Sequence, residues 1–403
     1  MSAETAVPQR PPPTSRAGAA SWWRARSGQQ RRLVWFGLAL LLALLYPFID
    51  GPLLAPLFGG STLGIMIPVL IYTLLALGLN IVVGYAGLLD LGYAAFFAIG
   101  AYTAAFLTSP ASPLPFRTDF WVALAASWAV ASLFGIVLGA PTLRLRGDYL
   151  AIVTLAFGEI VPRVFLNLEQ WTGGSKGMNP IGRPHILGYE LGHDPVTLGA
   201  VTLSAQVPWY YLIVAVGIAS IWAITRLYDS RLGRAWVAMR EDEVAAASMG
   251  INLVQTKLLA FAMGASFSGF AGAIFASIFQ FIDPFQFDFS ISIMVLAMVI
   301  LGGIGNVWGV LVGGLVLGLF DRGISAQLST WLRGLGAAIG FEPLATIDLS
   351  RSRMLLFGLA LVLLMLLRPQ GLFPSAQRRA ELTENEPEAP GELALDGQVA
   401  VER

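Results

Sequence analysis

The 403-residue sequence contains no cysteine, only two histidines and only two lysines. Without cysteine, disulfide frameworks, thiolate zinc sites and cysteine nucleophiles are excluded. Neither Lys176 nor Lys257 follows a glycine, so the chain has no P-loop for ATP. It also lacks a Gly-x-Ser-x-Gly elbow and a His-Glu-x-x-His motif. No enzymatic centre is expected.

Charge is scarce as well, since only 12% of the residues are charged and 56% are hydrophobic. A soluble domain carries roughly twice that charge, so the composition predicts an all-α polytopic membrane protein. The net charge is zero, so the chain as a whole has no excess of positive charge that would attract nucleic acid. The expected surroundings are membrane lipid.

Nine apolar stretches are long enough to span or half-span a bilayer, which needs about 20 apolar residues. Because one of them can fold back on itself, about 9–10 transmembrane or half-spanning helices are expected. The stretches are 33–49, 63–83, 85–107, 120–140, 149–166, 208–225, 258–282, 290–320 and 354–367.

Three regions are expected along the chain. Residues 1–32, with six arginines and a proline run, predict a disordered basic tail; 33–367 form the membrane domain; and 368–403 form an acidic disordered tail. Arginine-rich segments stay in the cytoplasm. This rule places both termini and a loop at 229–257 inside, and a loop at 168–207 outside.

The stretch 290–320 is too long for one ordinary span and contains Gly302 and Gly303 at its middle. A re-entrant hairpin turning at these glycines would keep the C-terminus inside, so it is preferred over one long tilted helix.

Polar residues at membrane depth are costly and are therefore functional candidates. The translocation-path candidates are Asn80, Asp90, Tyr93, Glu159, Gly302 and Gly303. Asp90 lies among glycines that favour a broken helix, where it could cap a half-helix, face water or contact an amino group, with capping preferred. Glu159 could instead form a structural ion pair with Arg163, four residues on.

Two other features have mainly structural interpretations. Small residues spaced by four from Ala260 to Ala276 predict close helix packing. His185 and His193 have acidic neighbours, but a metal site needs three or four converging ligands, so none is expected.

The inner loop 229–257 contains an alanine-rich segment, 242–249, that starts with acidic residues and ends at Gly250. This pattern predicts a short helix too charged to span a membrane. Such a helix could fit a groove of a partner protein or serve only as a solvated connector.

Several stretches, in order and over about 300 residues, resemble the LivM-type permeases of branched-chain amino acid ABC importers. They include Gly78-Leu79-Asn80, the glycine-rich run 84–102, Leu145 to Tyr149, Thr172-Gly173-Gly174, Gly233 to Trp236 with Arg240 to Gly250, Leu301 to Gly305, and Arg368 to Pro374.

The resemblance implies inward transport of leucine, isoleucine and valine by alternating access, in the cytoplasmic (inner) membrane of a prokaryote. It implies four kinds of interaction: a homologous second permease, two cytoplasmic ABC ATPase subunits, an extracytoplasmic substrate-binding protein and lipid. ATP and Mg²⁺ would be bound by the ATPases, and this chain would need no cofactor.

The implied ATPase-coupling residues are Arg240, Glu243, Ala246, Ala247 and Gly250. The chain departs from the general importer motif, because Glu243 lies seven residues before Gly250 and Val244 occupies the usual glutamate position. Alternative functions are a urea or other amino-acid or amide permease of the same family, or an ATP-independent secondary transporter.

Overall fold

The computed structural model describes residues 28–50, 61–142, 145, 147–186, 189–192, 194–198, 201–340 and scattered positions between 355 and 373. Most of the expected terminal tails and most of the stretch 354–367 lie outside these residues. The described parts of the tails are residues 28–32, which are helical and not disordered as expected, and residues 371–373. The chain divides into two compact units, residues 1–49 and 50–403. In the first unit, the described residues form one helix, α2 (Gly28–Ile49), which covers the expected stretch 33–49.

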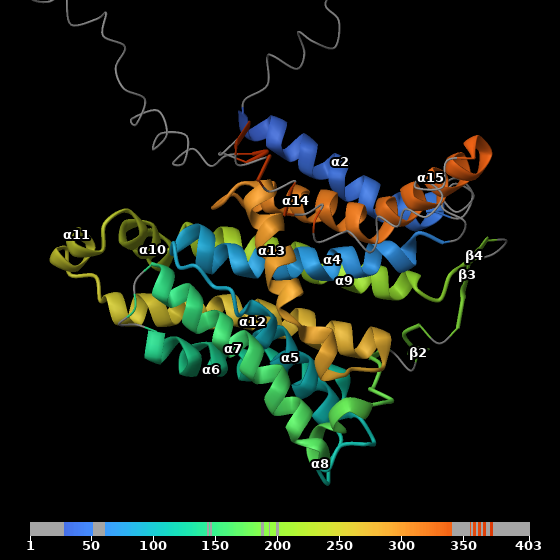
Figure 1. Cartoon of the computed structure of the whole chain (residues 1–403), viewed down its shortest axis with the longest axis horizontal. Coiled ribbons are helices and arrows are strands. Elements are labelled where there is room, and N and C mark those ends of the chain that lie inside the picture. The colour runs from blue at the N-terminus through green and yellow to red at the C-terminus, as the bar shows by residue number, and fades with distance from the viewer. Residues whose placement is uncertain are drawn as a thin grey trace, which may run out of the picture. The chain divides into compact units, whose positions relative to one another are not determined.

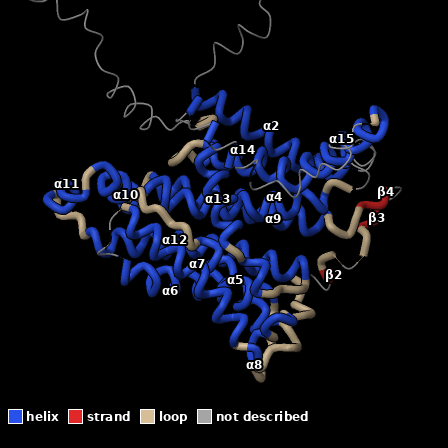
Figure 2. Tube along the Cα trace, viewed as in Figure 1, coloured by secondary structure: helices blue, strands red, loops and turns tan. Residues whose placement is uncertain are grey.

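The second unit is almost entirely helical (Figure 2). Its long helices are α4 (Leu63–Leu79), α5 (Tyr93–Thr108), α6 (Phe120–Thr142), α7 (Asp148–Asn167), α9 (Val207–Tyr228), α10 (Arg231–Glu241), α12 (Leu253–Phe279), α13 (Phe289–Gly302), α14 (Val307–Leu319) and α15 (Ser325–Ile339). The shorter helical elements are η2 (Asn80–Tyr85), α8 (Glu169–Thr172), η3 (Gly174–Lys176), α11 (Glu243–Ser248), η4 (Pro284–Phe287) and η5 (Phe320–Ile324).

Strands occur only in the segment between α8 and α9, among the described residues. Two small antiparallel hairpins form there: β1 (His185–Ile186) with β2 (Tyr189–Glu190), and β3 (Val196–Leu198) with β4 (Val201–Leu203). This segment was expected to be a loop, and it has no helix long enough to span a membrane.

Seven helical segments of the described chain are long and apolar enough to cross a membrane, and two shorter apolar helices accompany them. This result confirms an all-helical polytopic membrane fold. The seven segments are Leu63–Tyr85, Phe120–Thr142, Tyr149–Asn167, Val207–Tyr228, Leu253–Phe279, Pro284–Gly302 and Val307–Ile324.

Helix α12 packs against α4, α5 and α6 at the centre of the second unit (Figure 1). The small residues predicted for close packing are buried along it. A Cβ on Gly272 would lie 2.3 Å from the carbonyl oxygen of Phe97, and one on Gly264 would lie 2.4 Å from Val82 Cγ2. The small-residue stripe therefore brings α12 against the backbone of α5 and against η2, the turn that follows α4.

The expected span 85–107 starts eight residues too early. Helix α4 continues into the π-helical turn η2, the backbone of 86–92 is non-helical, and α5 begins only at Tyr93. Gly87 has a φ of +70°, a conformation that breaks a helix and that glycine adopts without strain. The prediction of broken backbone around Asp90 is confirmed.

The stretch 290–320 is not one long helix. Helices α13 and α14 are joined by a turn at residues 303–306, in which Gly303 has a φ of +115°. A Cβ on Gly302 would lie 2.3 Å from the carbonyl oxygen of Gly309, so the two helices contact each other through glycine. The predicted break is confirmed, while a re-entrant course through the membrane stays a prediction.

Two further boundaries differ from expectation. Helix α12 begins at Leu253, four residues before the expected end of the loop 229–257. Helix α15 was not anticipated, because its residues are only moderately apolar and follow the charged pair Asp321 and Arg322.

Candidate functional site

The helix expected before Gly250 is α11, and both of its ends are capped. Asp242 Oδ1 accepts hydrogen bonds from the backbone N–H groups of Val244 (2.7 Å) and Ala245 (3.0 Å). The bonds from Ala245 and Val244 also hold the pKa of Asp242 below its usual range. At the other end, Gly250 has a φ of +85°, and its N–H donates to the carbonyl of Ala247. These contacts cap the helix.

One face of α11 is turned inward and the rest is open. Ala246 is buried, whereas Ala247 and Gly250 are exposed. Val244 is 67% exposed and Met249 84%. Two large apolar side chains therefore project from a short capped helix, as expected of a surface that another protein covers.

The inward side of α11 is held by an ion pair. Glu243 Oε1 lies 2.7 Å from Lys257 Nζ on α12, and the Lys257 side chain is only 7% exposed. In the same region, the indole N–H of the fully buried Trp236 donates to the carbonyl of Thr256 (2.8 Å). Helices α10 and α11 are thereby fixed to the start of α12. Glu243 points inward, and Val244 occupies the outward position.

Arg240 joins α10 to the broken helix. Its Nη1 donates a 2.6 Å hydrogen bond to the carbonyl of Gly84 in η2, and its Cγ would lie 2.7 Å from a Cβ on Gly87. The close approach of the arginine stem to the backbone explains why glycine is required at position 87.

The same turn of η2 contacts the hairpin of α13 and α14. The side-chain oxygen of Asn80 accepts a 2.9 Å hydrogen bond from the N–H of Gly305. A Cβ on Gly84 would lie 2.2 Å from that oxygen and 2.8 Å from the Gly305 nitrogen. We call Asn80, Gly84, Arg240 and Gly305 the junction, because three separate segments of the sequence meet there: η2, α10 and the turn between α13 and α14.

Residues 371–373 complete this region. The N–H groups of Leu372 and Phe373 donate to the carbonyls of Leu301 (2.9 Å) and Gly302 (3.1 Å). The side-chain amide of Asn306 donates to the carbonyl of Phe373 (2.9 Å). Through these hydrogen bonds, the segment after the last expected span is attached to the turn that contains Gly302 and Gly303. We call residues 371–373 the clasp.

Asp90 and Tyr93 lie on the far side of the same break and are buried. Asp90 Oδ1 accepts from the N–H of Gly92 (2.9 Å), directly before α5, so it closes a turn rather than bonding to the first turn of the helix. The Tyr93 hydroxyl donates to the carbonyl of Gly264 on α12 (2.7 Å). Both residues brace α5 where it starts.

Glu159 does not join this group. It lies 3.5 Å from Arg163 on α7, and the two side chains are 43% and 76% exposed. Over the residues with assigned positions, no three His, Asp or Glu side chains converge as a metal site would require. His185 is exposed, and His193 lies outside the described residues.

Sequence reasoning missed Lys257 and Gly305. Lys257 carried a signal, since it is one of only two lysines and begins an otherwise apolar stretch. A lone cation at such a position calls for a carboxylate partner.

Comparison of the sequence with known proteins identifies membrane permeases as its relatives. The family described as "Branched-chain amino acid transport system / permease component" matches residues 61–339. The permease protein LivM of the high-affinity branched-chain amino acid transport system of Escherichia coli is 38% identical over 85% of this chain and 75% of its own length. No solved structure matches the chain.

Two more distant relatives match shorter parts of the chain. The LivH permease protein of the E. coli system is 26% identical over 69% of this chain and 87% of its own length. A probable LivM permease of Methanocaldococcus jannaschii is 29% identical over 61% and 66%. With the family match and the 38% identity together, the chain belongs to the multi-pass permease components of branched-chain amino acid ABC transport systems, whose ATP is handled by a separate subunit.

Proposed function

We propose that this chain imports leucine, isoleucine and valine as one of two related permeases, driven by two ATPase subunits that grip α11. The second permease would resemble LivH, and a substrate-binding protein would deliver the amino acid from outside. The observation that carries the proposal is the exposed face of α11 together with its rigid attachment to the junction.

The arginine pattern supports an orientation with α11 in the cytoplasm. Arg231, Arg234 and Arg240 all lie in α10, next to α11. Helix α12 then starts at the cytoplasmic side and, with 27 residues, reaches about 40 Å towards the outside. The segment with β1 to β4 would face the binding protein.

The contacts suggest how motion of the ATPases reaches the membrane. Movement of α11 displaces α10, because Asp242 joins the two helices directly. Arg240 transmits the displacement to the carbonyl of Gly84, and Asn80 passes it to the turn at Gly305. Two broken elements, η2 with 86–92 and the turn between α13 and α14, would absorb the change in backbone angles.

The residues proposed from sequence for the translocation path are assigned to different roles according to their contacts. Asn80, Gly302 and Gly303 belong with the junction and its clasp, and we assign them to transmission. Asp90 and Tyr93 brace the start of α5, and their burial next to broken backbone supports a place beside the path. The exposed pair of Glu159 and Arg163 supports a structural role at the surface of α7.

Single cysteines test the docking of α11 cleanly, because the chain has none of its own. In the membrane complex, Val244→Cys and Met249→Cys are each treated with a short cross-linker that has one thiol-reactive end and one amine-reactive end. Both are expected to cross-link to the ATPase subunit. Trp222→Cys on α9, 63% exposed, serves as the control and is expected to remain uncross-linked. Equal cross-linking of all three variants, or of none, would refute the docking role.

A further inference from the structure

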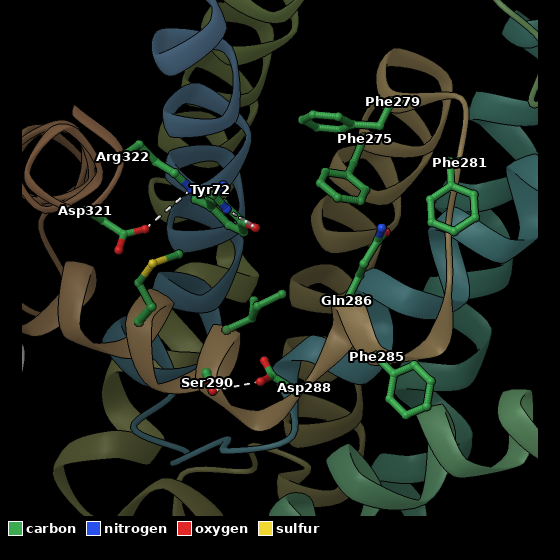
Figure 3. Close-up of a pocket in the computed structure, with 12 residues that line it drawn as sticks. Tyr72, Phe275, Phe279, Phe281, Phe285, Gln286, Asp288, Ser290, Asp321 and Arg322 are labelled. Carbon is green, nitrogen blue, oxygen red and sulfur yellow. Dashed lines mark hydrogen bonds and ion pairs between the residues drawn. The ribbon is translucent and has the colours of Figure 1, made fainter. Parts of the chain in front are cut away.

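A cavity of about 440 Å³ lies among α4, α12, α13 and η5 (Figure 3). It is at the Phe279 end of α12, whereas α11 contacts the start of that helix at Lys257. This volume is in the range of sites that hold small molecules. None of the residues proposed from sequence for the path lines it.

One side of the cavity carries a fixed guanidinium. Arg322 Nε lies 3.4 Å from Asp321 Oδ2, and Nη2 donates to the Tyr72 hydroxyl at 3.0 Å. The guanidinium carbon also lies 5.3 Å from the centre of the Tyr72 ring. Nη1 makes no hydrogen bond or ion pair with any described residue, so its N–H groups remain for an anionic ligand.

The other side offers acceptors. Asp288 Oδ2 accepts from the Ser290 hydroxyl at 2.8 Å, and no cation pairs with Asp288 in the described part of the chain. The side-chain oxygen of Gln286 is buried and, among the same residues, has no hydrogen-bond partner. Figure 3 shows Arg322 on one side of the view and Gln286 on the other, with Asp288 lower than both.

The remaining wall is apolar. The rings of Phe275 and Phe279 contact each other at a tilt, with ring centres 4.7 Å apart, and Ile291 and Met294 also line the cavity. An aliphatic side chain could be removed from water there. A ligand suited to the whole cavity needs an anionic group, a cationic group and a small hydrophobic part.

We propose that this cavity binds a free α-amino acid with an aliphatic side chain during transport. Arg322 receives the carboxylate, Asp288 and Gln286 receive the ammonium group, and the side chain lies against Phe275 and Met294. An uncharged amide would offer no anionic group to Arg322 Nη1 and no cationic group to Asp288, and a simple anion would meet the carboxylates of Asp288 and Asp321. This inference rests on the proposed function and deepens it by locating the substrate.

The test uses the complete transporter in proteoliposomes, with ATP inside and the binding protein loaded with radiolabelled leucine outside. Arg322→Gln and Asp288→Asn are each expected to lower the initial uptake rate about tenfold or more, since each removes a charge-assisted contact. Arg333→Gln on α15, which does not line the cavity, is expected to match the unchanged chain.

A second variant separates substrate contact from misfolding. Met294→Phe narrows the cavity. Leucine has one methylene group more than valine, so the narrower cavity is expected to disfavour leucine and to raise the ratio of valine to leucine uptake about threefold or more. A folding defect would lower both rates together and leave the ratio unchanged.

The outcomes distinguish the two claims. If the unchanged complex shows no ATP-dependent leucine uptake, the proposed function fails. If it transports leucine but Arg322→Gln and Asp288→Asn transport it normally, or Met294→Phe transports leucine and valine both at the rates of the unchanged chain, the cavity is not the substrate site and only this inference is overturned.

Discussion

The guanidinium of Arg240 donates a 2.6 Å hydrogen bond to the backbone carbonyl of Gly84, 156 residues earlier in the chain. Arg240 is the last arginine before α11, and Gly84 lies in the π-helical turn that ends the first long helix of the second unit. This one contact connects the surface proposed for the ATPase with the interior of the membrane domain.

Arg240→Ala should therefore uncouple the two functions of the complex. The ATPases would still hydrolyse ATP, but leucine uptake should fall about tenfold or more, because the link to Gly84 is lost. Uptake and ATP hydrolysis are measured on the same proteoliposomes. Arg231→Ala, on the exposed start of the same helix, is the matched control and should couple normally. Equal uptake by the two variants would contradict the role of Arg240.

Glu243 should matter more for holding α11 than for contacting the ATPase. Glu243→Gln leaves Lys257 buried without its charge partner, which should cost about 1–3 kcal/mol of stability. The double variant Glu243→Gln with Lys257→Met removes both charges and should recover most of the loss. Thermal unfolding of the purified complex in detergent measures the difference, and a double variant no more stable than Glu243→Gln would rule the pair out.

Gly250 should be required for its backbone angle rather than for space. No atom lies within 4 Å of a Cβ placed there, yet its φ is +85°. Gly250→Val should strain the end of α11 by about 1–2 kcal/mol and reduce uptake, whereas Gly250→Asn should retain most activity, since asparagine tolerates this conformation. Membrane insertion, followed by immunoblot, should be unchanged in both. Similar activity of the two variants would argue against a conformational requirement.

The cap at Asp242 predicts a particular pH dependence. Backbone hydrogen bonds lower the pKa of Asp242, so the cap is fully present above the usual aspartate value of about 3.9 and is lost only as the pH falls through the lowered value. Leucine uptake between pH 5 and 8 should not respond to this group. Asp242→Ala should speed hydrogen exchange in residues 243–250 at pH 7, and Asp242→Asn should not, because asparagine also caps helices. Matching exchange rates in the two variants would refute the cap.

Close packing of α5 on α12 gives a prediction about stability alone. A Cβ on Gly100 would lie 2.5 Å from Gly269 Cα, so Gly100→Ala should destabilise the protein by about 1–3 kcal/mol. Gly217→Ala in α9 meets no atom within 4 Å and should be neutral or slightly stabilising. Thermal unfolding in detergent compares them, and equal midpoints would contradict the packing argument.

The sequence allowed the local features of this fold to be predicted, because they depend on neighbouring residues. The helix before Gly250, the break near Asp90 and the turn at Gly303 all follow from glycine and capping patterns. Their partners could not be predicted: hydropathy does not show that Arg240 reaches Gly84 or that Asn80 reaches Gly305. Arg322 and Asp288 could not be predicted for the same reason, since each lies near the end of an apolar stretch and only the fold places both beside one cavity.

The most direct test of the account is uptake of radiolabelled leucine by proteoliposomes that contain this chain, its second permease and the ATPases, with the binding protein outside and ATP inside. We expect uptake that requires ATP and is reduced by unlabelled isoleucine and valine. Uptake by this chain alone without ATP, or ATP-dependent uptake that only urea reduces, would contradict it.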